Sequence, residues 1–205
     1  ISRQGWAGNY RIQRVDGDWT AWEPLPYQDH EIAHMTLWNG RIHAVIQGAL
    51  MASDDHGVSW EPVPGPDGPS LHQIFTARGA LFALTFVFGE GSRLHRTLDG
   101  QQWDDVTGPL APLSLTAWTE HLGAIYVVKY LGGGDGEVYR SIDDGQSFQL
   151  YDDMPPSAYA PNVFASTGSL LAVGYPSSEP PTCFLRQGEG PWEPYVEGMV
   201  FPQFN

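Results

Sequence analysis

Two histidines near the start of the chain have a spacing that is used in zinc sites. His30-Glu31-Ile32-Ala33-His34 matches H-E-x-x-H, and on a helix this spacing puts both imidazoles on one face, where they reach one zinc ion. The pentapeptide precedes Gly40 at a position where we predict a strand, on which the two histidines would lie about 13 Å apart. We therefore interpret the match as a coincidence, and we predict no metal site and no catalytic residue.

A glycine-rich stretch could in principle hold an ion or a phosphate. Gly132-Gly133-Gly134-Asp135-Gly136-Glu137 is not followed by a lysine or by a predicted helix, as a phosphate loop would be, so we expect a hairpin connection. One alternative stays open, a Ca²⁺ or ligand loop that uses Asp135 and Glu137, because Ca²⁺ takes hard carboxylate oxygens. We predict no other cofactor.

The charge balance excludes several classes of partner. The 205 residues include 10 Lys+Arg against 24 Asp+Glu, a formal net charge of −14. Nucleic acids and anionic membrane surfaces both require clustered basic residues, so we expect neither as a partner. No apolar run approaches the roughly 18 residues of a spanning helix, so we predict no membrane insertion.

Cysteine content and the first residues leave the compartment undetermined. Cys183 is the only cysteine, so no internal disulfide and no multi-cysteine metal site can form. The sequence begins Ile1-Ser2-Arg3, which we interpret as a mature, processed or trimmed piece of a longer product. We favour an extracytoplasmic or secreted location.

Two series of residues recur along the chain at nearly the same interval. The aromatics that follow predicted turns are separated by 38, 43, 45 and 44 residues and are Trp22, Trp60, Trp103, Phe148 and Trp192. The glycines at predicted hairpins before apolar runs are Gly40, Gly79, Gly123 and Gly168. A repeat of 40 to 45 residues with four short strands is typical of a propeller blade.

Three of the aromatics end a turn motif. Two segments, 53–60 and 141–148, have the pattern Ser-x-Asp-x-Gly-x-Ser-aromatic, and a third, 97–103, is a copy one residue shorter that begins with Thr. The hydroxyl and the carboxylate can bond backbone N–H groups inside a tight turn, and the glycine accepts positive φ. The aromatic then opens the next strand and buries its ring. The residues with these structural roles are Ser53, Asp55, Gly57, Trp60, Thr97, Asp99, Gly100, Trp103, Ser141, Asp143, Gly145 and Phe148.

These segments resemble the Asp-box, also called the BNR repeat, of sialidases and other β-propellers. The resemblance implies an all-β propeller of four-stranded antiparallel blades. In the second repeat we expect strands over Leu71–Ala77, Ala80–Phe88, Ser92–Thr97 and Gln102–Val106.

We predict a single propeller domain over residues 1–205, with four complete blades and a partial one. Tyr10–Leu25 would supply two strands of the partial blade, and Val196–Asn205 could add a strand that closes a five-bladed ring. The alternative is a portion of a propeller of six to eight blades. Blade ends are expected near residues 26, 66, 110, 155 and 199.

One segment resembles a sialidase motif. Tyr10-Arg11-Ile12 is similar to F/Y-R-I-P, which carries the first carboxylate-binding arginine of sialidases, but Gln13 stands in the place of the proline. The family also needs two further arginines, a Tyr–Glu nucleophile pair and an acid Asp. Arg96 and Arg140 directly precede turn motifs, so we expect them on outer strands. A sialidase-like glycoside hydrolase is therefore our alternative function.

A complete set of structural motifs beside an incomplete catalytic set favours a non-catalytic binding module for a protein or carbohydrate ligand. In this respect the chain resembles sialidase-like or photosystem-assembly-factor-like repeat proteins. A third reading is a set of scaffold blades inside a larger chain.

The turns join third and fourth strands, so the loops between second and third strands, and those between blades, should emerge at the opposite ends of the sheets. These loops are Pro24–Asp29, Val63–Ser70, Gly89–Ser92, Leu131–Glu137, Tyr151–Pro161 and Tyr175–Thr182. Tyrosines with carboxylates are suited to sugar or protein recognition. The candidate ligand-binding residues on these loops are Tyr27, Asp29, Asp135, Glu137, Tyr159 and Tyr175.

Overall fold

The computed structural model divides the chain into two compact units, Ile1–Asp105 and Val106–Asn205, which are described separately. The described residues are 13–15, 22–24, 32–68, 70–87, 91–111, 115–132, 135–153, 162–166, 169–174, 182–186 and 190–195. Within them the regular elements are β-strands and one short 3₁₀ helix, η1 (Gly108–Leu110).

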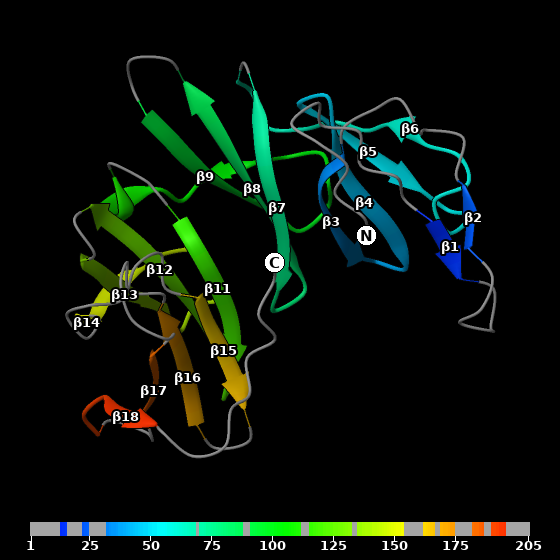
Figure 1. Ribbon diagram of the computed structural model, residues 1–205. Coiled ribbons are helices and arrows are strands. Elements are labelled where there is room, and N and C mark those ends of the chain that lie inside the picture. Colours follow the sequence, from blue (N-terminus) through cyan, green and yellow to red (C-terminus); the bar gives the residue numbers. More distant parts are fainter. Residues whose placement is uncertain are drawn as a thin grey trace. The chain divides into compact units, whose positions relative to one another are not determined.

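The first unit contains one two-stranded sheet and two four-stranded sheets (Figure 1). The two-stranded sheet pairs β1 (Gln13–Val15) with β2 (Trp22–Pro24). The first four-stranded sheet consists of β3 (Ile32–Trp38), β4 (Arg41–Ile46), β5 (Ala49–Ser53) and β6 (Glu61–Pro62). The second consists of β7 (Leu71–Ala77), β8 (Ala80–Val87), β9 (Gly91–Thr97) and β10 (Asp104–Asp105).

The second unit contains two further four-stranded sheets. One consists of β11 (Leu115–His121), β12 (Ala124–Gly132), β13 (Asp135–Ser141) and β14 (Gln149–Asp153). The other consists of β15 (Asn162–Ser166), β16 (Ser169–Gly174), β17 (Thr182–Arg186) and β18 (Glu193–Tyr195).

The predicted organisation into four-stranded antiparallel sheets is confirmed, since each sheet is a meander of strands that are consecutive in the sequence. In the second repeat β7 has the predicted bounds, and β8 and β9 differ from them by one residue each. The fourth strand, expected over Gln102–Val106, is only two residues long. It is short because only Asp104 and Asp105 pair with β9, and the chain then turns into η1.

Two-residue turns connect the first and second strands of the sheets. The central residues have positive φ, 49° and 78° at Asn39-Gly40, 51° and 77° at Arg78-Gly79, and 47° and 80° at Leu122-Gly123. Positive φ at both positions matches the right-handed twist of the strands and favours glycine at the second position. The fourth predicted hairpin glycine, Gly168, lies outside the described residues.

Several segments that were expected to be loops belong to strands. β12 continues to Gly132 and β13 begins at Asp135, so most of Leu131–Glu137 is paired backbone. Lys129 pairs with Glu137 and Tyr130 pairs with Gly136, and after an irregularity the pairing ends with Gly132 and Asp135. In the same way β14 takes in residues 151–153 and β9 takes in residues 91–92.

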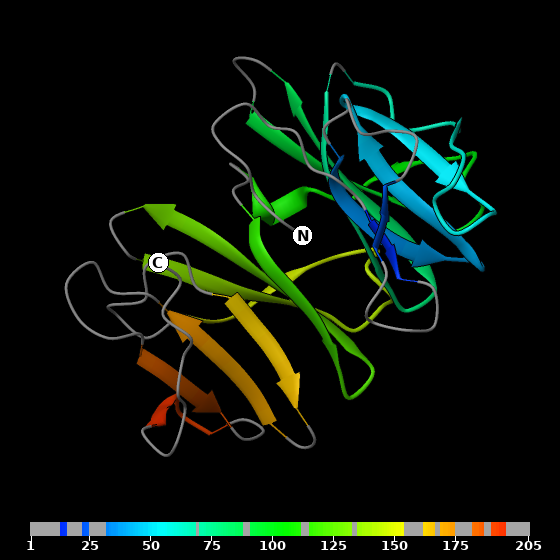
Figure 2. The same ribbon diagram turned by 45° about the vertical axis from the view of Figure 1, so that its right-hand side comes forward.

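The sheets of each unit stack face to face. In the first unit β7 lies against β3 and β4, and in the second unit β15 lies against β11 and β12 (Figures 1 and 2). The core of the first stack is Trp38, Val45, Leu50, Leu71, Ile74, Leu81 and Ala83, with Val63 and Trp103 against it. The core of the second is Ala117, Ala124, Tyr126, Val128 and Val138, with Tyr151, Phe184 and Trp192 against it.

Candidate functional site

The turn between β5 and β6 is closed by its own polar side chains. The Ser53 hydroxyl accepts a hydrogen bond from the Gly57 N–H at 2.8 Å and donates one to Asp55 at 2.8 Å. The Asp55 carboxylate accepts bonds from the N–H and the hydroxyl of Ser59, at 2.8 and 2.6 Å. Both carboxylate oxygens are thus bonded within the turn.

The turn between β13 and β14 repeats this geometry. The Ser141 hydroxyl accepts from the Gly145 N–H at 2.8 Å and donates to Asp143 at 2.7 Å. The Asp143 carboxylate accepts from the N–H and the hydroxyl of Ser147, at 3.0 and 2.6 Å. The following aromatic, Phe148, is 2% exposed and packs into the interior.

The turn between β9 and β10 is one residue shorter and differs in detail. The Thr97 hydroxyl accepts from the Gly100 N–H at 2.9 Å. The Asp99 carboxylate accepts from the backbone N–H groups of Gln101 and Gln102, at 2.8 and 2.9 Å. Trp103 then packs against the core of the first unit.

Hydrogen bonding sets the charge state of the turn carboxyls. Bonds from the hydroxyl and N–H of Ser59 lower the pKa of Asp55 to about 2. Partial burial raises the pKa of Asp143, but the bonds from Ser147 and Ser141 outweigh it and bring this pKa to about 2. Bonds from the N–H groups of Gln102 and Gln101 lower the pKa of Asp99. Carboxyls of this kind are deprotonated at neutral pH and unsuited to general acid catalysis.

Of the six candidate ligand-binding residues, four lie outside the described residues: Tyr27, Asp29, Tyr159 and Tyr175. The other two, Asp135 and Glu137, lie on β13, at the end of its sheet that is opposite the turn 141–148. Of the six candidate residues, the structure therefore describes only the two on β13.

Glu137 belongs to a polar cluster that includes the only lysine of the chain. The Tyr139 hydroxyl donates to Glu137 Oε2 at 2.9 Å, and Lys129 Nζ lies 3.9 Å from the same oxygen. Lys129 Nζ also donates to the Ala111 carbonyl at 3.3 Å and lies 5.6 Å from the centre of the Tyr139 ring. The side chain of Lys129 is 7% exposed and that of Glu137 is 22% exposed.

Burial, followed by the hydrogen bond and the charge of Glu137, raises the pKa of Tyr139 to about 12. The phenol therefore remains a hydrogen-bond donor over the physiological range. The cluster joins a buried ammonium group and a buried phenol to a carboxylate, at one end of the sheet, and the carboxylate is the most exposed of the three. Sequence reasoning did not find Lys129 and Tyr139 as site residues. The one signal was a lysine directly after the apolar run Ala124–Val128.

The corresponding end of the sheet β7–β10 also contains a buried polar pair. Thr85 Oγ1 and His95 Nε2 are hydrogen-bonded at 3.0 Å. Burial lowers the pKa of His95. The charge of Asp105 opposes this shift, the charge of Arg93 adds to it, and the charge of Asp67 opposes it. Because Thr85 pairs with Arg93 as Lys129 pairs with Glu137, the two sheets place different polar groups at one register position.

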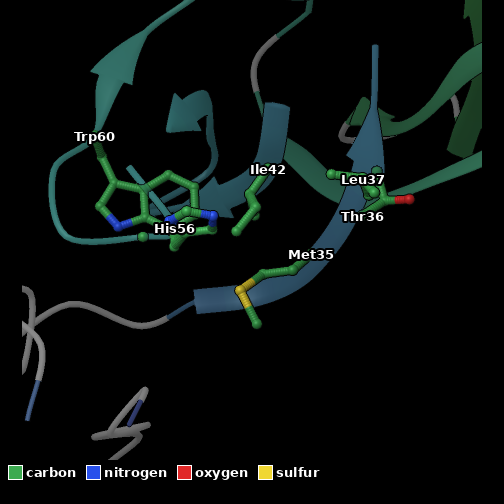
Figure 3. Close-up of a pocket in the computed structure, with 7 residues that line it drawn as sticks. Met35, Thr36, Leu37, Ile42, His56 and Trp60 are labelled. Carbon is green, nitrogen blue, oxygen red and sulfur yellow. The ribbon is translucent and has the colours of Figure 1, made fainter. Parts of the chain in front are cut away.

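An apolar pocket of about 310 Å³ lies on the sheet β3–β6. Figure 3 shows Met35, Leu37 and Ile42 on two strands of this sheet and Trp60 with His56 beside them. Thr36 and Gly57 complete the lining. No motif in the sequence indicated this pocket.

Two segments resembled catalytic motifs in the sequence, and the structure describes only part of each. His34 lies on β3, a strand as predicted, whereas His30 lies outside the described residues. Of the sialidase-like segment, only Gln13 is described, on β1. In the part of the chain that the structure describes, no three His, Cys, Asp or Glu side chains gather closely enough to hold a metal ion. Across the same residues, no helix is both long and apolar enough to cross a membrane.

No protein-family model matches the chain, and no curated protein matches it either. Solved structures do. The structure titled YCF48 bound to D1 peptide has a TM-score of 0.62 and 16% identity, covering 91% of this chain and 60% of that one. A nidogen/laminin complex gives a TM-score of 0.65 and 11% identity, covering 92% of this chain and 75% of that one.

The N-terminal domain of Nup159 is also similar, with a TM-score of 0.51 and 10% identity, covering 81% of this chain and 48% of that one. This chain thus spans about 60% of the YCF48 chain and about half of the Nup159 domain. At these identities the likeness establishes the fold alone. The fold is a β-propeller of four-stranded antiparallel blades.

Proposed function

We propose that this chain is an Asp-box β-propeller that binds a protein or peptide through the ends of its sheets opposite the Asp-box turns. The observation that carries the proposal is the cluster of Lys129, Glu137 and Tyr139 at such an end. Pre-positioned groups of opposite charge and a phenol are the kind of polar contacts that fix the register of a bound chain.

The hydrogen bonding of the turn carboxylates makes the turns themselves a poor binding surface, and this supports binding at the opposite ends of the sheets. Asp55 and Asp143 spend both carboxylate oxygens on their own turns. A ligand at the turns would have to break these bonds, whereas Glu137 is partly exposed. The turns therefore serve to hold third and fourth strands together, and recognition belongs to the opposite ends.

The class of ligand is supported by the fold neighbours. One is described as bound to the D1 peptide, and another as a nidogen/laminin complex. Each of these neighbours is thus described in complex with a peptide or a protein. A carbohydrate is the second ligand class that the tyrosine and the carboxylate would suit.

The test starts from a displayed library of random peptides selected on the folded protein. We expect Lys129→Gln and Glu137→Gln each to lower the affinity of the protein for a selected peptide at least tenfold. The matched control, Leu122→Ser, changes a residue that is 82% exposed at the turn end of the same sheet, and it should leave affinity unchanged. Equal losses in all three variants, or turnover of a fluorogenic sialoside, would contradict the proposal.

A further inference from the structure

A second pocket of the first unit, of about 230 Å³, is lined by residues of the sheets β3–β6 and β7–β10 and of the turn between β9 and β10. Its apolar lining includes Trp38, Leu50 and Leu81, and its polar lining includes Arg41, His43 and Asp99. A pocket that combines apolar walls with a few polar groups is suited to a small ligand.

One carboxylate at this pocket has an oxygen that its turn does not use. Asp99 Oδ1 accepts the bonds from the N–H groups of Gln101 and Gln102. In the part of the chain that the structure describes, Asp99 Oδ2 accepts no hydrogen bond. The same oxygen of the two longer turns accepts from the hydroxyl of Ser59 or Ser147. The shorter turn has no serine in that place, so Oδ2 is left for another donor.

A buried histidine has a second unused acceptor at the same pocket. His43 is 4% exposed, and its Nδ1 donates to the Arg41 carbonyl at 3.3 Å. Burial lowers the pKa of His43, so at neutral pH the ring is uncharged and Nε2 carries a lone pair. Among the described residues, no donor bonds to Nε2. This nitrogen is therefore available to a donor that enters the pocket.

The histidine stands where two other sheets have a larger aromatic ring. His43 is the third residue of β4, and Phe82 and Tyr126 are the third residues of β8 and β12. Phe82 is fully buried and stacks on Phe75, and Tyr126 is 5% exposed. The sheet β3–β6 instead has a smaller, polar ring beside a pocket. A buried polar atom without a partner lowers stability, and an occupant of the pocket would recover that loss.

The charges around the pocket favour a cation. The Arg41 guanidinium forms ion pairs with Asp54 at 2.6 Å and with Glu61 at 2.5 Å, so two negative charges exceed its one positive charge. Hydrogen bonds lower the pKa of Asp99, so its carboxylate adds a third negative charge. An indole such as that of Trp38 also attracts cations to its face.

We propose that this pocket binds an alkylammonium group, which a small amine or a lysine side chain can supply. The ammonium donates to Asp99 Oδ2 and to His43 Nε2. The alkyl chain lies against Trp38, Leu50 and Leu81. Hydrogen bonds between an ammonium and a carboxylate are roughly twice as strong as neutral ones. The site belongs to the first unit and does not depend on the function proposed for β13.

The probe for the test is n-butylammonium, and butyrate and n-butanol are the matched anion and neutral compound at the same ionic strength. Nitrogen-15 NMR follows the Trp38 indole and the Gly100 amide, and we expect a saturable shift with butylammonium alone. Asp99→Asn keeps an oxygen for the turn but loses the charge, so it should lower the affinity at least about tenfold. Asp55→Asn makes the same change in a turn whose carboxylate oxygens are both bonded, and it should leave the affinity unchanged.

A second variant tests the pocket without altering the turn. His43→Phe introduces at this position the ring that β8 has in Phe82, and it should abolish binding; its melting temperature checks that it is folded. The proposal would be overturned by equal shifts with butylammonium and butanol, by no saturable shift, or by equal affinity of the unchanged protein and Asp99→Asn. A further probe, acetyl-lysine methylamide, separates the two sources. Affinity equal to that of butylammonium assigns the pocket to lysine side chains, and weaker binding assigns it to free amines.

Discussion

Arg186 occupies in the sheet β15–β18 the register position that Ser141 occupies in the sheet β11–β14. Ser141 pairs with Ile125, and Arg186 pairs with Leu170, each partner being the second residue of the second strand. The Ser141 hydroxyl bonds its own turn, whereas the Arg186 guanidinium forms an ion pair with Asp152 of the neighbouring sheet. At one register position β17 thus carries a link to the neighbouring sheet, where β13 carries a hydroxyl that bonds its own turn.

We expect Arg186 to contribute strongly to the stability of the folded protein. The Arg186 guanidinium lies 4.6 Å from the centre of the Tyr151 ring and 5.8 Å from that of Trp192, and its side chain is 8% exposed. We expect Arg186→Ala to lower the free energy of unfolding by about 2 kcal/mol or more, since it removes a buried ion pair and two cation–π contacts. Urea denaturation measures this loss.

The control is Arg93→Ala, which removes an exposed ion pair with Asp105 at 3.5 Å. Exposed pairs contribute about 1 kcal/mol or less. Equal losses in the two variants would show that the Arg186 cluster does not stabilise the second unit.

A comparison of Gly100 with Gly79 tests how tightly the Trp38 ring packs against Gly100. Both have φ near +75°, 72° and 77°, but only at Gly100 would a Cβ meet the indole, at 3.2 Å. Gly79→Ala should cost about 1 kcal/mol from backbone strain alone. We expect Gly100→Ala to cost at least about 1 kcal/mol more in the same urea titration, and a smaller or equal cost would mean that the contact is loose.

The turn carboxyls predict a pH dependence of stability. Asp55 and Asp143 have a pKa of about 2 in the folded protein, against 3.8 for the ordinary group. A lowered folded pKa contributes stability that is present above about pH 4 and is lost as the pH falls toward about 2. The melting temperature should therefore fall over this window, and less steeply in a double Asp55→Asn, Asp143→Asn variant.

Asp104→Asn serves as the control for that experiment, because Asp104 lies on β10 and outside the turns. It should leave the acid profile as steep as in the unchanged protein. A double variant with an unaltered profile would show that the two turn carboxyls do not carry the acid sensitivity.

Tyr139 reports on the cluster at the end of β13. Its pKa of about 12 comes first from burial and then from Glu137, so Glu137→Gln should lower this pKa while leaving it above the usual value of 10. Carbon-13 NMR of labelled tyrosine rings follows the titration. Glu120→Gln, on β11, should not move it. An unchanged Tyr139 pKa in Glu137→Gln would mean that the 2.9 Å hydrogen bond is not maintained in solution.

The sequence predicted the sheets well because their signals are local. Gly40 and Gly79 sit in turns that require positive φ, and the apolar runs after them form second strands. The site was harder to predict because its contacts cross between strands. Lys129 meets Glu137 only through the register of β12 and β13, and the pocket at Met35 depends on how sheets stack. Neither relationship leaves a fixed spacing in the sequence.

The most direct test of the proposed binding surface is hydrogen–deuterium exchange with and without a selected peptide. If the peptide binds at the ends of the sheets opposite the Asp-box turns, backbone amides over residues 129–139 should exchange more slowly, and exchange in the turn 141–148 should be unchanged. Protection confined to the turn 141–148, with no change near Lys129 and Glu137, would contradict the account.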